Sequence, residues 1–130
     1  MAVRYSVREV GDVSVLDVFG QLTLGEMVPC SEGTGAVLAD AIADLGKKRR
    51  KRVLMNLAGV TYVDSCGIGH LVSAIARAKR LNVELKLCNA ATPVFALLRM
   101  THLERVVDIA NSEADGLAAF GKPAAAAQKT

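Results

Sequence analysis

The most regular hydrophobic pattern of the chain lies between Val53 and Leu81. It opens with an almost unbroken apolar run, Val-Leu-Met-Asn-Leu at 53–57, which is typical of a strand buried on both faces of a parallel sheet. After a short polar turn, apolar residues recur at spacings of three and four, the period of an amphipathic helix. The sequence therefore predicts a buried strand, a tight turn and a long helix in succession.

The predicted helix has an apolar side and a polar side. The apolar side should pack on the sheet through Ile68, Leu71, Val72 and Ile75. The polar side should face solvent with His70, Ser73 and Arg77. Either Asp64 or Ser65 can cap the first turn by accepting backbone N–H bonds. Free N–H donors and the positive end of the helix dipole meet at this start, so a phosphate on Ser65 would be stabilised.

The N-terminal third of the chain predicts a β-hairpin and a helix. Alternating residues indicate strands at 3–10 and 13–19, joined by a turn at Gly11-Asp12 and ended by Gly20. The first strand should be half-buried on one face through Val3, Tyr5 and Val7. Glycines and a proline indicate a loop at 25–35, and an apolar stripe then predicts a helix at 36–45 that is ended by Gly46.

The C-terminal third predicts two more strands and two more helices. A strand at 83–88 alternates apolar residues with Glu84 and Lys86, and a last strand is expected at 105–109. Between them lies a helix at 92–103 with Thr92 as its cap, and we expect His102 to adopt a left-handed conformation near its end. Ser112 should open a final short helix that reaches residue 120.

These elements together define an α/β fold. We expect one domain over 1–120, with a mixed sheet of four or five strands, an N-terminal antiparallel hairpin and about four helices. A chain of 130 residues is long enough to bury a single core. Residues 121–130 hold no large apolar side chain, so we expect a disordered tail.

The composition argues against several classes of protein and site. The chain is 52% hydrophobic and 22% charged, as in a globular protein, without the roughly 20-residue apolar run of a membrane-spanning helix. Its three cysteines include no C-x-x-C pair, which argues against a zinc site or a disulfide framework. No basic-then-apolar export signal occurs in the first ten residues. We therefore expect a cytoplasmic protein without membrane insertion, metal or cofactor.

Most of the net charge of +3 is local, because residues 47–52 are all basic. This run can be a solvated connection after a helix, or it can recognise an acidic partner, RNA or a lipid surface. Aromatic residues make up only 4% of the chain, and none alternates with the basic residues. Single-stranded nucleic acid would lack stacking platforms here, so we expect no direct nucleic-acid binding.

An enzymatic reading rests on Cys66 and His70. They are spaced i, i+4, and the thiol would lie near a helix N-terminus that can lower its pKa. No oriented base or oxyanion hole is indicated beside them, and a small buried cysteine is a common core residue. A nucleotide fingerprint is also absent, since G-x-G-x-x-G would need glycine where Val72 stands. We therefore expect a binding module and not an enzyme.

The central stretch also carries a family resemblance. A strand LMNL followed by AGVTYVDSCGIGHL and a helix resembles the STAS domain, and in particular the bacterial anti-sigma factor antagonists, whose signature is an apolar strand followed by D-S-[SAC]-G-[LIV]-G. The resemblance extends more weakly over 3–120. In that family, the serine of the signature is phosphorylated by a kinase that is also the anti-sigma factor.

The resemblance implies a function for this chain. Ser65 would be the phosphorylation site, and the unphosphorylated protein would sequester an anti-sigma factor with a serine kinase domain. The partner-binding residues would be Asp64, Cys66, Gly67, Gly69, His70, Ser73 and Arg77. Gly67 and Gly69 would let the partner backbone approach the helix start closely.

Several alternatives remain open. Ser65 can simply cap the helix, which explains a serine there without any modification. Related domains also act as unphosphorylated structural subunits of stress-signalling assemblies or lipid transporters, and a homo-oligomer is possible. Relatives often read G-x-L-D where this chain has Gly20-Gln21-Leu22-Thr23 and then the loop at 25–35. That loop can alter partner choice or be a plain surface extension.

Overall fold

The computed structural model describes residues 4–22 and 37–120. Their strands form one five-stranded sheet in the order β1-β2-β3-β4-β5. The bounds of the strands are β1 Arg4–Val10, β2 Val13–Leu22, β3 Arg52–Val63, β4 Glu84–Cys88 and β5 Asp108–Ala110. β1 runs antiparallel to β2, and all the other pairs are parallel. The predicted α/β fold with an N-terminal hairpin is confirmed.

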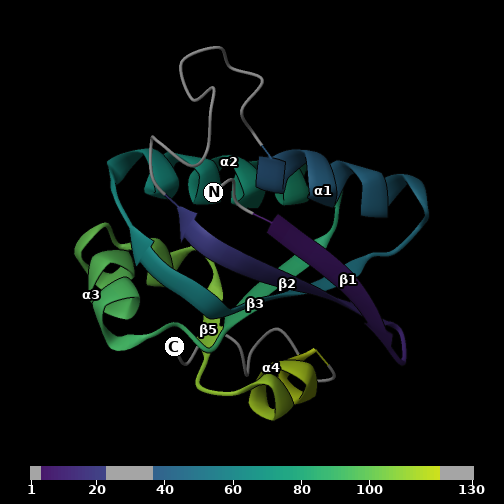
Figure 1. Ribbon diagram of the computed structural model, residues 1–130. Helices are drawn as coiled ribbons and strands as arrows, with labels where there is room; N and C mark the ends of the chain where they lie inside the picture. The colour runs from purple at the N-terminus through teal and green to yellow at the C-terminus, as the bar shows by residue number, and fades with distance from the viewer. Residues whose placement is uncertain (1–3, 23–36, 121–130) are drawn as a thin grey trace.

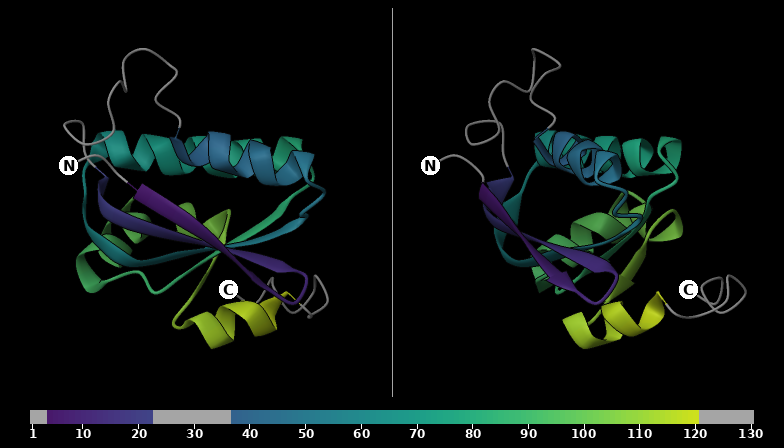
Figure 2. Two further views of the ribbon diagram at one scale, coloured as in Figure 1. Left: turned by 45° about the vertical axis from the view of Figure 1, so that its right-hand side comes forward. Right: turned by 90° about the vertical axis from the view of Figure 1, so that its right-hand side faces the viewer.

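Helices cover the sheet on two sides (Figure 1). Their bounds are α1 Val37–Lys47, α2 Ser65–Arg80, α3 Thr92–Met100, the 3-10 helix η2 Leu103–Arg105 and α4 Glu113–Ala119. α1 and α2 lie side by side on one side, and α4 lies on the other (Figures 1 and 2). This arrangement leaves one long side of α2 exposed along its whole length.

Two apolar clusters hold these layers together. The larger cluster joins α1, α2 and α3 to the sheet, and its fully buried side chains include Leu16, Leu38, Ile42, Met55, Leu57, Leu71, Leu87 and Leu98. The smaller cluster lies beneath α4 and consists of Val13, Val15, Leu54, Cys88 and Phe120. α4 approaches the sheet so closely that a Cβ atom on Gly116 would lie 2.7 Å from Leu54 Cδ1. Any larger residue at 116 would therefore have to displace the buried Leu54 side chain.

Several predicted ends are wrong by a few residues. β2 continues past Gly20, because glycine accepts the φ of 107° that an irregular register with β3 requires there. α1 continues through Gly46 to Lys47, and the chain turns at Arg49 with a φ of 64°. Ala91, not Thr92, is the N-cap of α3, and it makes no side-chain cap bond. Cap residues compete locally, so neighbouring positions are hard to separate by sequence.

The last strand is shorter than predicted. Residues 103–105 form η2 and Val106 is exposed, so pairing with β4 begins only at Asp108. His102 has a φ of 63°, as predicted, and it ends the turn between α3 and η2. Ser112 caps α4 by accepting a bond from Asp115 N, and this prediction is also confirmed. Local capping signals were thus reliable here where a serine hydroxyl could reach the N3 amide.

The predicted half-burial of β1 is wrong. All seven of its residues are exposed, including Tyr5 and Val7, because α2 packs over β2, β3 and β4 and leaves the edge strand uncovered. Lys86, one of the polar residues that alternate with apolar ones in β4, is only 5% exposed. It lies beneath α4, where its Nζ atom is 2.6 Å from Asp108 Oδ2 and 5.3 Å from the Phe120 ring centroid. Both outcomes depend on which helix covers which face.

Candidate partner-binding surface at the start of helix α2

The Asp64-Ser65 turn joins the end of β3 to the start of α2. Asp64 is the N-cap: its backbone is extended, and its Oδ1 atom accepts a hydrogen bond from Gly67 N at 3.0 Å. Its carbonyl accepts the first helical bond, from Ile68 N at 2.9 Å. The carboxylate therefore satisfies one of the free N–H groups and fixes the turn, as an aspartate cap does.

Ser65 is the first residue of α2, and its side chain is exposed. No hydrogen bond links its hydroxyl to the described residues. The first turn of α2 holds no acidic side chain. A group attached to this hydroxyl would therefore project into solvent at the positive end of a 16-residue helix.

The exposed side of α2 continues from Ser65 as a row of small side chains. Gly69, Ser73 and Ala76 follow it at helical spacing, and all three are exposed. A Cβ atom on Gly69 would meet nothing within 4 Å. Packing within the chain therefore does not require glycine at this position, in contrast to Gly116. We call this row, Ser65, Gly69, Ser73 and Ala76, the α2 ridge.

Two large apolar side chains are exposed close by in the sequence. Tyr62, near the end of β3, is 54% exposed, and Val72 on α2 is 45% exposed. Val72 was predicted to pack on the sheet, and that prediction is wrong. Alternation from the buried Val60 would have placed Tyr62 on the buried face. The register with β2 is irregular between these two residues, and Val63 is buried instead, so the sequence pattern could not have predicted that Tyr62 is exposed. Exposed apolar residues beside a polar turn are typical of protein-binding surfaces.

His70 was predicted to lie on the exposed side of α2, and this prediction is wrong. His70 is 5% exposed, its Nδ1 atom has no hydrogen-bond partner among the described residues, and burial lowers its pKa. The buried arc of α2 holds Gly67, His70, Leu71, Ala74, Ile75 and Ala78. The predicted stripe is therefore rotated around the helix by less than one residue step of about 100°. The cause is that α2 packs against α1 as well as the sheet.

The remaining predicted site residues divide between both ends of α2. Arg77 lies about 18 Å along the helix from Ser65, at 1.5 Å per residue. It lines a groove of about 650 Å³ between α1 and the C-terminal end of α2, together with Asp40, Lys47 and Leu81. The structure therefore groups Asp64, Ser65, Gly69 and Ser73 on one exposed surface. It does not place Arg77 beside them. The side chain of Cys66 and the loop at 25–35 lie outside what the structure describes.

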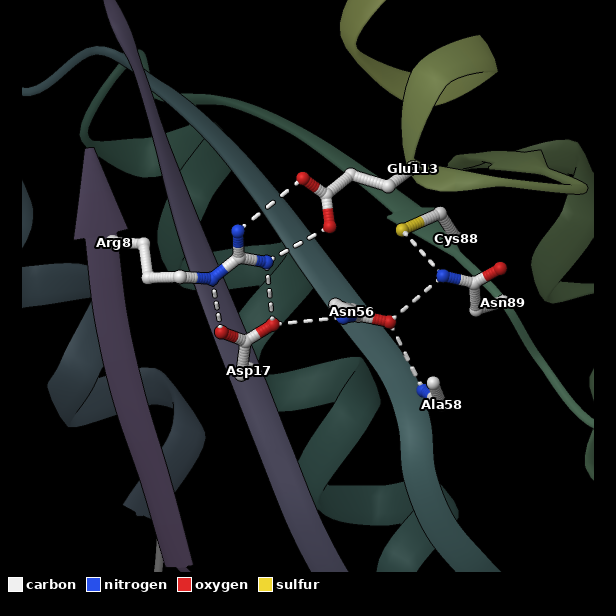
Figure 3. A network of polar contacts seen from close by, with 7 residues as sticks. All are labelled: Arg8, Asp17, Asn56, Ala58, Cys88, Asn89 and Glu113. Atoms are coloured by element: carbon white, nitrogen blue, oxygen red, sulfur yellow. Dashed lines mark hydrogen bonds and ion pairs between the residues drawn. The ribbon is translucent and has the colours of Figure 1, made fainter. Parts of the chain in front are cut away.

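A second polar region lies on the α4 side of the sheet, and no sequence pattern predicted it (Figure 3). The Arg8 guanidinium donates to Asp17 at 2.6 and 3.0 Å and to Glu113 at 2.8 and 3.3 Å. Asn56 donates to Asp17 at 2.7 Å, and Asn89 donates to Asn56 at 3.0 Å. Bonds from Arg8 hold the pKa of Asp17 below its usual range. We call Arg8, Asp17, Asn56, Asn89 and Glu113 the cross-sheet network.

The cross-sheet network links β1, β2, β3, the end of β4 and α4. Each of its five side chains has a partner within the network, so the network ties these elements together. Burial raises the pKa of the neighbouring Cys88 thiol to about 11, which keeps it protonated. In residues 4–22 and 37–120, no cluster of side chains could hold a metal ion, and no helix is long and apolar enough to cross a membrane.

The comparisons with known proteins agree with this fold. The sequence model of the STAS domain matches residues 4–116, and the chain therefore belongs to the STAS domain family. An anti-sigma factor antagonist from Mycobacterium paratuberculosis has a TM-score of 0.74 at 18% identity, with 93% of this chain and 96% of that chain covered.

Two more solved structures share the fold. The Bacillus cell fate determinant SpoIIAA in its phosphorylated form has a TM-score of 0.62 at 13% identity, over 90% of this chain and 99% of its own. A sulfate transporter family protein from Wolinella succinogenes has a TM-score of 0.65 at 13% identity, over 95% and 93%. Likenesses at these identities show a common fold, and functions within it have to be argued from the site.

Proposed function

We propose that this protein is an anti-sigma factor antagonist whose binding is controlled by phosphorylation of Ser65. The observation that carries the proposal is that Asp64 and Ser65 have different roles at the turn. Asp64 caps α2, which leaves the exposed Ser65 hydroxyl without a hydrogen bond to the described residues. A serine needed only as a cap would use its oxygen for that purpose.

The partner surface in this proposal is the α2 ridge together with Asp64, Tyr62 and Val72. The side chains of the α2 ridge are small and project little from the helix. Gly69 leaves open space where a partner backbone can approach. Tyr62 and Val72 supply exposed apolar area on which a partner can close. The proposed partner is an anti-sigma factor with a serine kinase domain, because such a partner would have to reach the Ser65 hydroxyl to transfer phosphate.

Phosphorylation would act by charge and not by refolding. A phosphate adds about −1.5 to −2 charges at Ser65. The start of α2 accepts that charge, so the protein itself tolerates it. A partner face that docks closely on the ridge would have to desolvate the phosphate, and a loss of about 1.4 kcal/mol is enough for each tenfold change in affinity. The family kinship with SpoIIAA, which is known in a phosphorylated form, supports this proposal.

The test compares three variants at one position. The kinase partner is captured from extracts of the native cells, identified by mass spectrometry and purified. Its affinity is then measured for Ser65→Ala, Ser65→Asn and Ser65→Asp. Asparagine has the shape of aspartate without its charge, so we expect at least tenfold weaker binding by Ser65→Asp than by Ser65→Asn. Equal affinities of these two variants would rule out control by charge.

The modification itself has a separate test. The protein is incubated with the purified partner and ATP, and peptides are analysed by mass spectrometry. We expect one phosphate, on Ser65, with none on the neighbouring exposed Ser73. A phosphate on Ser73 alone would move the site away from the turn, and the absence of any phosphate would remove the kinase from the proposal.

A second candidate function is a permanent structural subunit. The likeness to a sulfate transporter family protein favours it, because that likeness shows the same fold in a protein of another functional class. In that case the chain would co-purify with its partners in fixed stoichiometry, and the Ser65→Asp variant would remain in the assembly. Exchange of the partner on addition of ATP would favour the antagonist instead.

A further inference from the structure

β1 leaves one complete edge of the sheet unpaired. In the described residues nothing pairs with its outer side, and all seven of its residues are exposed (Figure 2). The strands β1 and β2 meet in a two-residue turn in which Val10 pairs with Val13. In such a turn, the two closing residues form two backbone hydrogen bonds with each other. Along β1 from Val10, the N–H groups then point alternately toward β2 and away from it. The amides of Tyr5, Val7 and Glu9 therefore point away from the sheet.

This edge lacks the features that usually prevent pairing with another chain. β1 contains no proline or lysine, and its register with β2 has no bulge. Its charged side chains are turned back over the sheet, since Arg8 binds Asp17 and Glu113 while Glu9 pairs with Arg50. Apolar Tyr5 and Val7 are 40% and 41% exposed on one face. The edge is therefore open to a further strand.

We propose that β1 pairs with β1 of a second copy of this chain, antiparallel, about a two-fold axis at Val7. In this register, Val7 lies opposite Val7 of the second copy and Tyr5 lies opposite Glu9. These are the residues whose amides point outward, so three pairs can each exchange two backbone bonds. Ser6 then lies opposite Arg8, and Arg4 lies opposite Val10. All seven residues are paired, and no like charges meet.

Other symmetric registers are worse for a physical reason. A shift that changes the axis by one residue places Arg4 opposite Arg8 or places Arg8 opposite itself, and like charges directly opposite are destabilising. In registers whose two-fold axis falls between two residues, an amide that points toward β2 lies opposite one that points outward. These registers also place opposite faces of the two strands on the same side. Shifts of two residues keep the outward amides opposed, but an axis at Glu9 places Glu9 opposite itself, and an axis at Tyr5 pairs only three residues of β1. The charges and the length of RYSVREV together thus favour the register about Val7.

The interface would be small. A single pair of seven-residue strands buries less surface than a standard stable interface, so the dimer should dissociate on dilution. It would join two sheets into one without covering the α2 ridge, since α2 packs over β2, β3 and β4 and has its small side chains exposed. This inference does not depend on the proposed function of Ser65.

The test uses charge at Tyr5, which would face Glu9 of the second copy twice in each dimer. The dissociation constant is measured by analytical ultracentrifugation for the wild type, Tyr5→Lys and Tyr5→Glu. Both variants lose the tyrosine, so their difference reports the charge. We expect Tyr5→Lys to bind about 2- to 30-fold more tightly than Tyr5→Glu, from two cross-strand pairs. The same pair of substitutions at Met100, which is 78% exposed in α3, should leave the constant unchanged.

A cross-link tests the register directly. With Cys30 and Cys66 replaced by serine, Val7→Cys should form a disulfide-linked dimer on mild oxidation, because directly opposite residues lie within disulfide reach. Ser6→Cys should link far more slowly, since its opposite residue is Arg8. Circular dichroism confirms that each variant is folded. A wild type that stays monomeric at all concentrations, or equal linking by both cysteine variants, would overturn the proposal.

Discussion

The cross-sheet network and the Asp64-Ser65 turn are both polar, but they differ in whether their side chains are already hydrogen-bonded within the protein. Every side chain of the network is bonded to another member, and Arg8 alone joins two carboxylates. At the turn, one side chain serves the helix and its neighbour projects into solvent. Conspicuous polar contacts therefore mark structure here, and the functional candidate is the group that structure does not use.

Glycines show the same contrast. A side chain at Gly116 would displace the buried Leu54, whereas Gly69 borders open space. Packing therefore explains the small residue at 116 and leaves the one at 69 unexplained. Under the proposed function, the open space at Gly69 is where a partner backbone approaches. The predictions below test how sharply the two regions separate, in order of decreasing effect.

Removal of Asp17 should have the largest effect. Asp17→Ala leaves the donors of Arg8 and Asn56 without their acceptor at a site that is 8% exposed. We expect a loss of about 2–3 kcal/mol in the free energy of unfolding, measured by urea denaturation. Asp17→Asn, which keeps an acceptor, should lose less. An unchanged free energy in both variants would show that the network is dispensable.

His70 should make stability depend on pH. Burial lowers its pKa from 6.5, so the unfolded chain takes up a proton first as the pH falls. Its contribution is complete above pH 6.5 and is lost as the pH falls through the folded-state pKa, by at most about 1.4 kcal/mol per pH unit. His70→Leu should flatten this part of the stability curve. Asp17, whose folded-state pKa lies below 3.8, acts only in a more acidic range.

Loss of the cap should cost less than loss of the network. Asp64→Ala removes the bond to Gly67 N, and we expect a decrease of about 1 kcal/mol in the free energy of unfolding. Asp64→Ser keeps a capping oxygen and should recover most of the stability. If alanine and serine are equally destabilising, the carboxylate acts there through something other than capping.

Ser65→Ala should have the smallest effect on stability. Its hydroxyl makes no bond to the described residues, so the free energy of unfolding should change by no more than about 0.5 kcal/mol. Thermal denaturation of this variant and of Asp64→Ala in parallel gives the comparison directly. A loss as large as that of Asp64→Ala would mean that Ser65 also caps the helix, and the contrast between the two residues would fail.

The extent to which the sequence predicts this structure depends on how local each cause is. The order of strand, turn and helix from β3 through α2 was predicted, because hydrophobic period, turn and cap all act within a few residues, although β3 continues to Val63, beyond the apolar run at 53–57. The face of α2 was misjudged at His70 and Val72, since only the packing of α1 decides the width of the buried arc. Alternation along β1 likewise could not reveal that no helix covers that edge.

Contacts between residues far apart in the sequence could not be predicted from local patterns. Arg8 and Glu113 meet across 105 residues, and Lys86 is buried only because α4 returns to cover it. The choice between Asp64 and Ser65 as the cap also needed coordinates, because both residue types cap helices well and they are adjacent. For the candidate site, the sequence thus identified the turn, and the geometry separated the roles of its two residues.

The parallel pairing of β2 with β3 has a consequence for how the protein folds. Its register joins Ser14 to Val53, so the pair can form only after the intervening chain, with α1 in it, has closed into a loop. The hairpin of β1 and β2 closes through two residues and can form much earlier. Closure entropy grows only with the logarithm of loop length, by about 0.6 kcal/mol for each doubling. A longer connection between β2 and α1 therefore adds little to the folding barrier, which makes this crossover a place where the chain can change length without slowing its own assembly.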